Sequence, residues 1–266
     1  MAVVARARDT APVSEPTDND VSLPWFAATR PERPLLTHER IVGAAHELVH
    51  VGGVDAPSVR ALARSLDVGA SQLHRRIERK EHLLVAVADL VLSEIQVPSE
   101  ARDQTAETWR ERLRSFAFDI RRVLADHPHV HPVLDSYVLV TPAAVRVAEH
   151  AVSILLGAGY EGDTLVDAYN AWAGYVFGFS VVEMQPEQRR SDRLQLERWV
   201  RTYLGGLDRH RHPGLHAALP ALENRAFGLR WEAGPLGVGG SSFGVGLDAL
   251  LAGLPSPRPE PSSRVS

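Results

Sequence analysis

Side chains that can read a base edge and hold a polyanion come together in residues 58–84, SVRALARSLDVGASQLHRRIERKEHLL. The amide of Gln72 can bond adenine bidentately, and the hydroxyl of Ser71 can bond several bases. Four basic residues follow shortly after them, Arg75, Arg76, Arg79 and Lys80. This combination predicts contact with a nucleic acid, and the alternative is a solvated charged face.

The charge of this part of the chain is opposite to that of the rest. From Arg33 to Lys80 there are eight lysines and arginines against five acidic residues, a surplus of +3. The whole chain has a net charge of −4, which leaves −7 for the other residues. A basic module joined to an acidic remainder favours an anionic partner for the module.

The elements that must position these side chains are helices, because the apolar residues recur at helical spacing. One stripe over about 37–51 consists of Ile41, Ala44, Ala45, Leu48 and Val49. We expect Thr37 to be the N-cap of this first helix. A second helix from Ser58, a turn at 67–69, a third helix over about 70–77 and a fourth from Lys80 are expected to follow.

Two short helices joined by a tight turn form a helix-turn-helix, whose second helix can enter the major groove of DNA. Residues at the start of that helix then face base edges, and basic residues around it meet phosphates. The N-terminus of the fourth helix also offers free N–H groups to a phosphate. The predicted DNA-contacting residues are Thr37, Ser58, Arg60, Ala70, Ser71, Gln72, His74, Arg75, Arg76 and Lys80.

The rest of the chain is also predicted to be helical, over about 108–125, 141–157, 164–184 and 191–204. A last helix has Phe243, Leu247, Leu250, Leu251 and Leu254 on one face. Strand alternation is missing, so the expected fold class is all-α. Residues 1–35 and 255–266 are rich in proline and polar residues, and both are predicted to be disordered.

Catalysis finds no support in the sequence, which has no cysteine, no Gly-x-Ser-x-Gly elbow and no His-Glu-x-x-His helix. In HPHVHP, His127, His129 and His131 stand at alternate positions, and three such histidines in an extended segment could bind a divalent metal. The prolines and the lack of nearby fixed carboxylates favour an ordinary loop. We therefore expect no metal site and no cofactor.

A membrane location is not indicated either. The sequence has no run of about 18 apolar residues, and its N-terminus lacks the apolar core of a signal peptide. The absence of cysteine fits a reducing compartment. We therefore expect a cytoplasmic protein without a membrane partner.

The stretch LTHERIVGAAHELVHVGGVDAPSVRALARSLDVGASQLHRRIERKEHLL resembles the DNA-binding domain of the tetracycline-repressor (TetR) family. Shared features are the apolar first helix, S-x-R-x-L-A at the second helix, L-x-V at the turn and K-x-x-L at the fourth helix. The sequence departs from the family at His74, where tyrosine is usual, and at Arg76, where histidine is usual; Asp67, Gly69 and Arg79 are further departures. The resemblance implies a DNA-binding domain over residues 36–97.

Two later stretches, HPVLDSYVLVTPAAVRVAEHAVSILLGAGYEGDTLVDAYNAWAGYVFGFSVVEMQ and FGVGLDALLAGL, are more loosely similar to the regulatory domain of the same family. The resemblance implies that residues 98–254 bind a small-molecule effector and form a homodimer through a four-helix bundle. The bundle would contain the helix over 169–183 and the last helix of each subunit. The effector-binding residues that we predict are His131, Trp172, Tyr175 and Phe179, with plain core packing as the alternative for each aromatic residue.

These features lead to one expected function, a homodimeric transcriptional repressor. The N-terminal domain would read a roughly palindromic operator in double-stranded DNA, and a small, hydrophobic effector would release it. Three alternatives stay open at this point: a metal-responsive regulator that uses the histidine cluster, a regulator that activates or needs a co-repressor, and an all-α enzyme.

Overall fold

The structure, a computed structural model of the chain, describes residues 35–98, 108–136, 140–183, 190–227, 229, 236 and 240–255. Every regular element in these ranges is a helix, so the predicted all-α class is confirmed. All of these helices belong to one compact unit that begins at Thr37. The predicted disordered segments, 1–35 and 255–266, lie almost wholly outside the described residues and stay predictions, as do the predicted domain boundaries.

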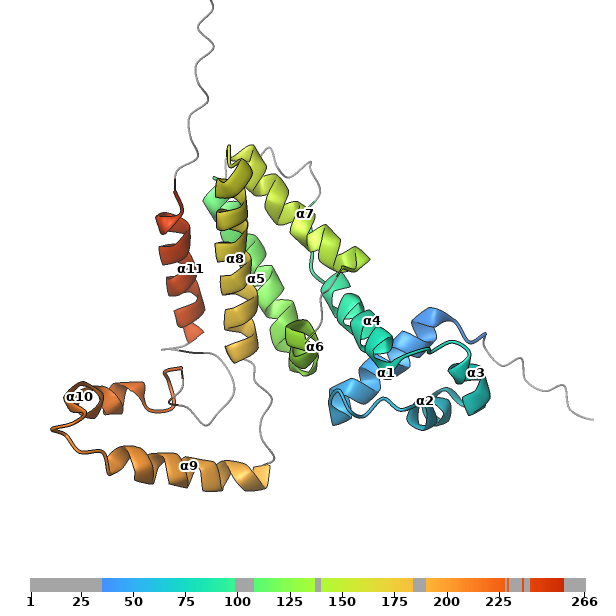
Figure 1. Cartoon of the computed structure of the whole chain (residues 1–266), viewed down its shortest axis with the longest axis horizontal. Coiled ribbons are helices and arrows are strands. Elements are labelled where there is room, and N and C mark those ends of the chain that lie inside the picture. The colour runs from blue at the N-terminus through green and yellow to red at the C-terminus, as the bar shows by residue number, and fades with distance from the viewer. Residues whose placement is uncertain are drawn as a thin grey trace, which may run out of the picture. The chain divides into compact units, whose positions relative to one another are not determined.

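Figure 1 shows the helices in chain order, with the N-terminal ones in blue. These are α1 (His38–Gly52), α2 (Val59–Leu66), α3 (Ala70–His74) and α4 (Lys80–Ser93). They are followed by α5 (Trp109–Asp126), the 3-10 turn η2 (Pro128–Val130), α6 (His131–Ser136), α7 (Pro142–Gly157), α8 (Gly162–Glu183), α9 (Arg190–Gly205), α10 (Pro213–Leu222) and α11 (Ser242–Gly253). In the part of the chain that the structure describes, no helix is both long and apolar enough to cross a bilayer.

Local chemistry determines where the first helices begin and end. The hydroxyl of Thr37 accepts a hydrogen bond from the backbone N–H of Arg40 at 3.3 Å, and that of Ser58 accepts one from Ala61 at 3.1 Å. Both predicted N-caps are therefore confirmed. Asp67 follows α2 with a left-handed backbone, φ 52° and ψ 50°, which aspartate tolerates better than most residues.

Helix α3 is shorter than the predicted range of 70–77. The backbone N–H groups of Arg76 and Ile77 both donate to the carbonyl of Leu73, each at 2.8 Å. The helical ladder therefore tightens into a turn and the helix ends at His74. As a result, Arg75 and Arg76 lie just beyond the helix instead of inside it.

The core of the N-terminal part forms where α1 packs against α4 and α2 packs against both α1 and α3. Its buried apolar side chains include Ile41, Val42, Ala45, Val49, Leu62, Leu73, Leu83, Leu84, Val87 and Ala88. The buried face of α4 continues through Val91 and Leu92 to Ile95, as its helical spacing predicted. Helix α4 thus has enough apolar surface to pack against two neighbours along its length.

Helix α4 is joined to α7 by hydrogen bonds at the ends of both helices. The carboxylate of Asp89 accepts from the backbone N–H of Ala143 at 2.8 Å, in the first turn of α7. In return, the guanidinium of Arg146 donates to the carbonyls of Ser93 and Ile95 at the end of α4, at 3.0 and 3.3 Å. The negative charge of Asp89 thus lies at the N-terminus of α7, and the positive charge of Arg146 lies at the C-terminus of α4. Both placements are favourable for the helix dipole, and each typically stabilises a helix by about 0.3–1 kcal/mol.

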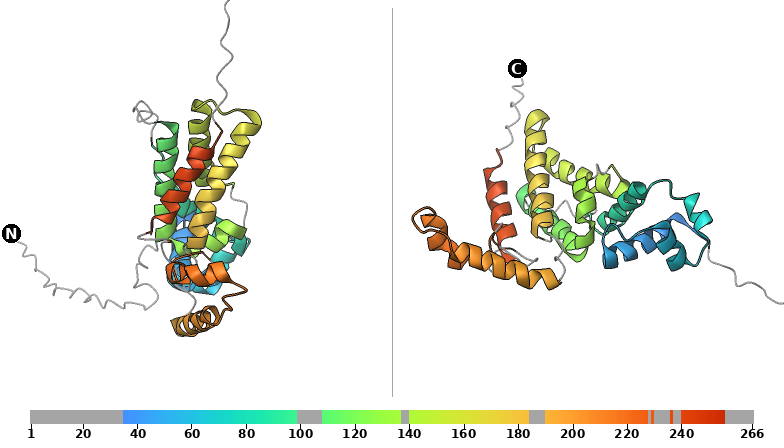
Figure 2. Two further views of the ribbon diagram at one scale, coloured as in Figure 1. Left: turned by 90° about the vertical axis from the view of Figure 1, so that its left-hand side faces the viewer. Right: turned by 60° about the horizontal axis from the view of Figure 1, so that its bottom comes forward.

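Behind this junction, α5 packs against α7, α8 and α11. The rings of Phe116 on α5 and Trp172 on α8 stack 5.9 Å apart, and the indole N–H of Trp172 donates to the carbonyl of Leu113 at 3.3 Å. Helix α11 lies beside α8 in both views of Figure 2, with its buried face of Phe243, Leu247 and Leu251 as predicted. These contacts form the core of the C-terminal part.

Helix α10 and the turn at η2 were missed by the sequence analysis. Pro213 and Pro220 made the segment of α10 look unlike a helix. Pro213, however, stands in the first turn of α10, where a backbone N–H would have no partner within the helix anyway. The segment HPHVHP, expected to be an ordinary loop, is helical: Pro128 begins η2 and His131 begins α6. The prediction of a loop was therefore wrong. Its prolines stand in the first turns of two short helices, where proline is well tolerated.

A buried ion pair connects α5, α8 and the segment before α11. Arg121 donates from Nε to Glu183 Oε2 at 2.8 Å, and the backbone N–H of Leu236 donates to Glu183 Oε1 at 2.8 Å. The side chain of Glu183 has no exposed surface, whereas that of Arg121 is 18% exposed. Removing the arginine would leave a carboxylate inside the protein with one partner fewer.

We expect the substitution Arg121→Ala to lower the free energy of unfolding by about 3–5 kcal/mol, because it removes the guanidinium that lies 2.8 Å from the buried carboxylate of Glu183. The measurement is urea denaturation followed by circular dichroism. Arg122→Ala is the control: Arg122 is exposed and its pair with Asp119 spans 3.9 Å, so its loss should cost at most about 1 kcal/mol. Equal effects of the two substitutions would contradict a structural role for the buried pair.

Candidate nucleic-acid interface and effector cavity

The start of α3 presents polar side chains outward from an apolar anchor. Leu73 is fully buried between α2 and the rest of the N-terminal core, which fixes the rotation of the short helix. Ser71, Gln72 and His74 are exposed as a result, and Ala70 is half-buried. The helix can therefore offer an amide, a hydroxyl and an imidazole to a groove without losing any core packing.

The residues predicted to meet phosphates surround this helix. Those that are exposed are Thr37, Ser58, Arg60, Arg75 and Arg76. The hydroxyls of Thr37 and Ser58 accept hydrogen bonds as N-caps, and each still has its own O–H to donate. The structure thus gives these residues the exposure that phosphate contacts require.

Lys80 has an intramolecular partner that the sequence did not reveal. Its ammonium group lies 3.1 Å from the carboxylate of Asp55, which precedes α2. The lysine side chain is 39% exposed and that of Asp55 is 98% exposed, so this ion pair is screened by water and weak. A phosphate at this position can replace the carboxylate at little cost.

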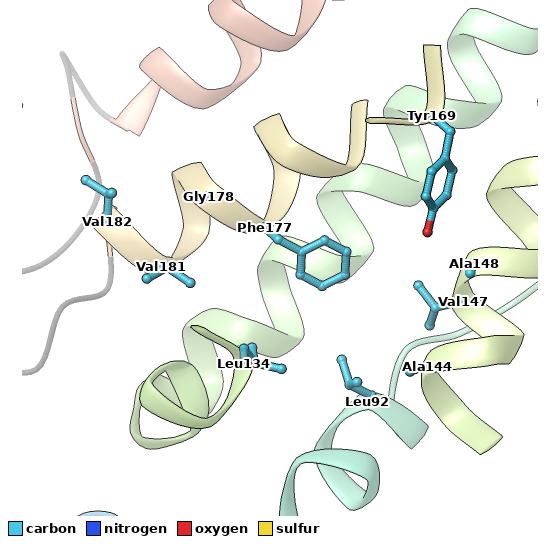
Figure 3. A pocket seen from close by; sticks show the side chains of 10 residues that line it. All are labelled: Leu92, Leu134, Ala144, Val147, Ala148, Tyr169, Phe177, Gly178, Val181 and Val182. Carbon is cyan, nitrogen blue, oxygen red and sulfur yellow. The ribbon is translucent and has the colours of Figure 1, made fainter. Parts of the chain in front are cut away.

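A second feature is a cavity of about 490 Å³ between α4, α6, α7 and α8. This volume lies in the range of small-molecule binding sites. Figure 3 shows the side chains around it. The lining residues are Leu92, Leu134, Ala144, Val147, Ala148, Tyr169, Phe177, Gly178, Val181 and Val182.

The lining is apolar except for one group. The hydroxyl of Tyr169 is the single side-chain polar group among these ten residues, and Figure 3 shows it pointing into the space between Phe177 and Val147. Burial raises the pKa of Tyr169, so the phenol stays protonated and can donate a hydrogen bond. An apolar space with one donor is the usual composition of a small-molecule site.

The four effector residues predicted from the sequence are not among the cavity's lining residues. Trp172 packs in the core against Phe116, and the Tyr175 hydroxyl donates to the carbonyl of Phe243 on α11 at 2.8 Å. Phe179 packs against Phe243 as well. The remaining one, His131, is buried, with Nε2 3.1 Å from the carbonyl of Leu124. The three aromatic residues therefore make the contacts of core packing, which was the alternative to effector binding.

Tyr169 is a lining residue that the sequence pattern did not indicate, although it lies on the same helix as Trp172, Tyr175 and Phe179. Tyr169, Phe177 and Val181 are spaced by eight and four positions, so they share a face of α8. Trp172, Val176 and Ser180 occupy the buried face toward α5. The helical period separates these two faces, but it does not say which one borders a cavity.

The cavity touches the core that carries the helices predicted to contact DNA. Leu92 belongs to α4 and Leu134 to α6, and both line the cavity. Leu134 also packs against a buried cluster formed by Val49, Leu84, Ala88 and Val133. Atoms in contact with a ligand are therefore one packing layer away from α1.

A further surface lies on the outer side of α8 and α11. Val166 on α8 is 54% exposed and Val245 on α11 is 67% exposed. A Cβ added at Gly174 would meet no atom within 4 Å, so the backbone of α8 is open to close approach there. This apolar strip lies on the two helices for which the resemblance implies a dimer interface.

Comparison with known proteins agrees with this architecture. The family described as "Tetracyclin repressor-like, C-terminal domain" matches residues 102–256, more than half of the chain. An HTH-type transcriptional regulator of Saccharopolyspora erythraea is 33% identical over 156 residues, which cover 58% of this chain and 64% of that protein. The HTH-type transcriptional repressor DrrR1 of Streptomyces coeruleorubidus is 29% identical over 240 residues, covering 88% of this chain and 84% of that one.

A solved structure leads to the same group. A TetR transcriptional regulator from Streptomyces coelicolor superposes with a TM-score of 0.58 and 25% identity, over 83% of this chain and 98% of the other. The relatives carry the names of regulators and repressors, and the match includes both the helix-turn-helix part and the C-terminal part. The chain therefore belongs to the tetracycline-repressor (TetR) family of transcriptional regulators, which act by binding DNA and not by catalysis.

Proposed function

We propose that this chain is a homodimeric repressor, which binds a roughly palindromic operator and leaves it when an apolar small molecule fills the cavity. The observation that carries the proposal is that the cavity and the DNA-contacting helices share α4 and its core. The repressor DrrR1, similar over most of the chain, supports the direction of the regulation. In this proposal the protein acts in the cytoplasm, where it has access to DNA.

In the proposed complex, α3 enters the major groove and places Ser71 and Gln72 against base edges. Arg60, Arg75 and Arg76 are exposed beside it and neutralise phosphates. Two copies on a two-fold axis would read half-sites separated by about 34–36 Å or a multiple of it. The operator is therefore expected to be a pseudo-palindrome.

Release requires that the effector bind one arrangement of the helices better than the other. A ligand between Leu92 and Leu134 presses on α4 and α6 together. Because Leu134 packs on the cluster around Val49 and Leu84, a shift of α6 changes the support of α1. A ligand that fits the cavity equally well in both arrangements would shift nothing.

The experiment that tests the function has two stages. The purified chain is used to select duplexes from a random pool, and compounds are then screened for release of the selected duplex. A selected pseudo-palindrome and a releasing compound would support the proposal. A compound that is needed for binding would indicate a co-repressor instead, and a chain that selects no duplex would overturn the proposal.

Base reading and phosphate binding are separable by two substitutions. Gln72→Ala should cost about 1–3 kcal/mol on the selected operator and relax the preference at one base pair, with little change on random DNA. Lys80→Gln should weaken binding to every duplex and reduce the slope of log K against log salt by about 0.9. Fluorescence anisotropy at several salt concentrations measures both effects.

An unchanged operator preference in the Gln72 variant would remove that residue from the reading surface. Asp55→Asn serves as the matched partner of the lysine substitution, because it removes the carboxylate that lies 3.1 Å from Lys80. It should leave operator binding equal or tighter.

Filling the cavity should separate DNA binding from release. Ala148→Phe places a ring in the apolar space, so the variant should bind the operator normally and resist release by the compound found in the screen. Val145→Phe on the same helix is the control, since Val145 is 54% exposed and does not line the cavity. Normal release of the Ala148 variant would place the effector elsewhere.

Dimerisation is expected to use the strip on α8 and α11. Gly174→Arg puts a long charged side chain where a second helix must approach, so the variant should sediment as a monomer and lose operator affinity. Gly157→Arg is the control, because a Cβ at Gly157 also meets no atom within 4 Å, but at the end of α7. A dimeric Gly174 variant in analytical ultracentrifugation would refute this interface.

A further inference from the structure

We propose that His46, His127 and His129 bind one divalent transition-metal ion, with zinc as the best-fitting metal and His50 as the fourth ligand. The site would cross-link α1 to the turn after α5. It lies away from the lining of the effector cavity, and it does not depend on the proposed function. The histidines come from two segments that are about 80 residues apart in the sequence.

One pair of ring nitrogens already stands at the separation that a shared metal ion requires, and the third histidine lies close to both. One ligand atom from each of His46, His127 and His129 lies within 4.8 Å of the other two. His46 Nε2 and His127 Nδ1 are 3.3 Å apart. Two nitrogens bound to a tetrahedral zinc at about 2.0–2.1 Å would stand about 3.3–3.4 Å apart.

A carboxylate fixes the orientation of one ligand. His127 Nε2 lies 3.0 Å from Oε2 of Glu94, the residue that follows α4. The carboxylate accepts the Nε2–H, which leaves the lone pair on Nδ1, the atom that faces His46. A histidine held in this way by a carboxylate is the common outer arrangement of metal sites in proteins.

The third histidine has a nitrogen without a protein partner. His129 Nε2 is buried and makes no hydrogen bond, although a buried imidazole nitrogen normally has one. An ion in the cluster would satisfy the ring that the protein alone leaves incompletely bonded.

The chemistry of the donors selects the class of metal. Imidazole nitrogens suit zinc, copper and nickel, whereas magnesium and calcium require mostly oxygen ligands. Zinc accepts four ligands in a tetrahedron, and His50, which is exposed at the edge of the cluster, can supply the fourth. His50 lies next to the cluster, with its ring centroid 4.9 Å from that of His129.

The expectation from the sequence alone was different. It places His127, His129 and His131 together in an ordinary loop, because of the prolines and the lack of nearby fixed carboxylates. The helical turn sends His131 into the core, where it is buried, and His46 takes the third place. Glu94 supplies the missing carboxylate from the end of α4.

The test uses the full chain, freed of metal by a chelator and then titrated with zinc in a calorimeter. We expect one ion per chain, a higher melting temperature and slower hydrogen exchange at the end of α1, because the ion connects α1 to η2. Titration with cobalt should give the intense visible absorption of a tetrahedral site. No saturable binding of either metal would overturn the proposal.

Variants identify the ligands. His46→Asn and His129→Asn should each weaken zinc binding by at least about 100-fold, and Glu94→Gln, which removes only the orienting carboxylate, by about 10–100-fold. His50→Ala changes an exposed residue, so it tests the fourth ligand without disturbing the core. His210→Ala, an exposed histidine outside the cluster, is the control and should bind normally.

Circular dichroism of each metal-free variant ensures that lost binding is not lost folding. If His46→Asn and His129→Asn are folded and bind zinc as tightly as the unchanged chain does, the assignment is wrong. If either variant does not fold, the folded His50→Ala and Glu94→Gln variants decide the question. Unchanged affinity in both of these would also refute the site.

Discussion

The position of α4 is the constraint on which the rest of the structure depends. One continuous apolar face, from Leu84 to Ile95, must be buried against α1 near its start and against α7 near its end. Asp89 and Arg146 fix the second contact, because each charge satisfies backbone groups at the end of the neighbouring helix. A helix held on both sides in this way cannot move relative to one neighbour without changing its packing on the other.

The two candidate ligand sites both involve residues at the end of α4. Leu92 lines the cavity, and Glu94, two positions later, bonds His127 of the histidine cluster. A small molecule and a metal ion would therefore both act on the last turn of α4. Coupling between two such sites is a difference in binding free energy between two arrangements, and it must be the same in both directions.

Helix α8 has three faces, and each of them meets different surroundings. Trp172, Val176 and Ser180 are buried toward α5, while Tyr169 and Phe177 face the cavity. Val166 and Gly174 lie on the outer face, where the backbone is open. A helix that is apolar on nearly all sides has the composition of a core helix, so the pattern does not distinguish a cavity wall from a subunit interface.

The amino-acid sequence by itself determined the all-α class, the caps at Thr37 and Ser58, the turn at Asp67 and the buried face of α4, because these follow from contacts within a few residues along the chain. Tertiary structure alone decided the cavity lining, the pairing of Lys80 with Asp55 and the assembly of His46 with His127 and His129. Each of these joins residues far apart in the sequence, and helical periodicity says which side chains share a face but not what that face meets. Local patterns therefore predicted the helices, whereas packing between them produced the sites.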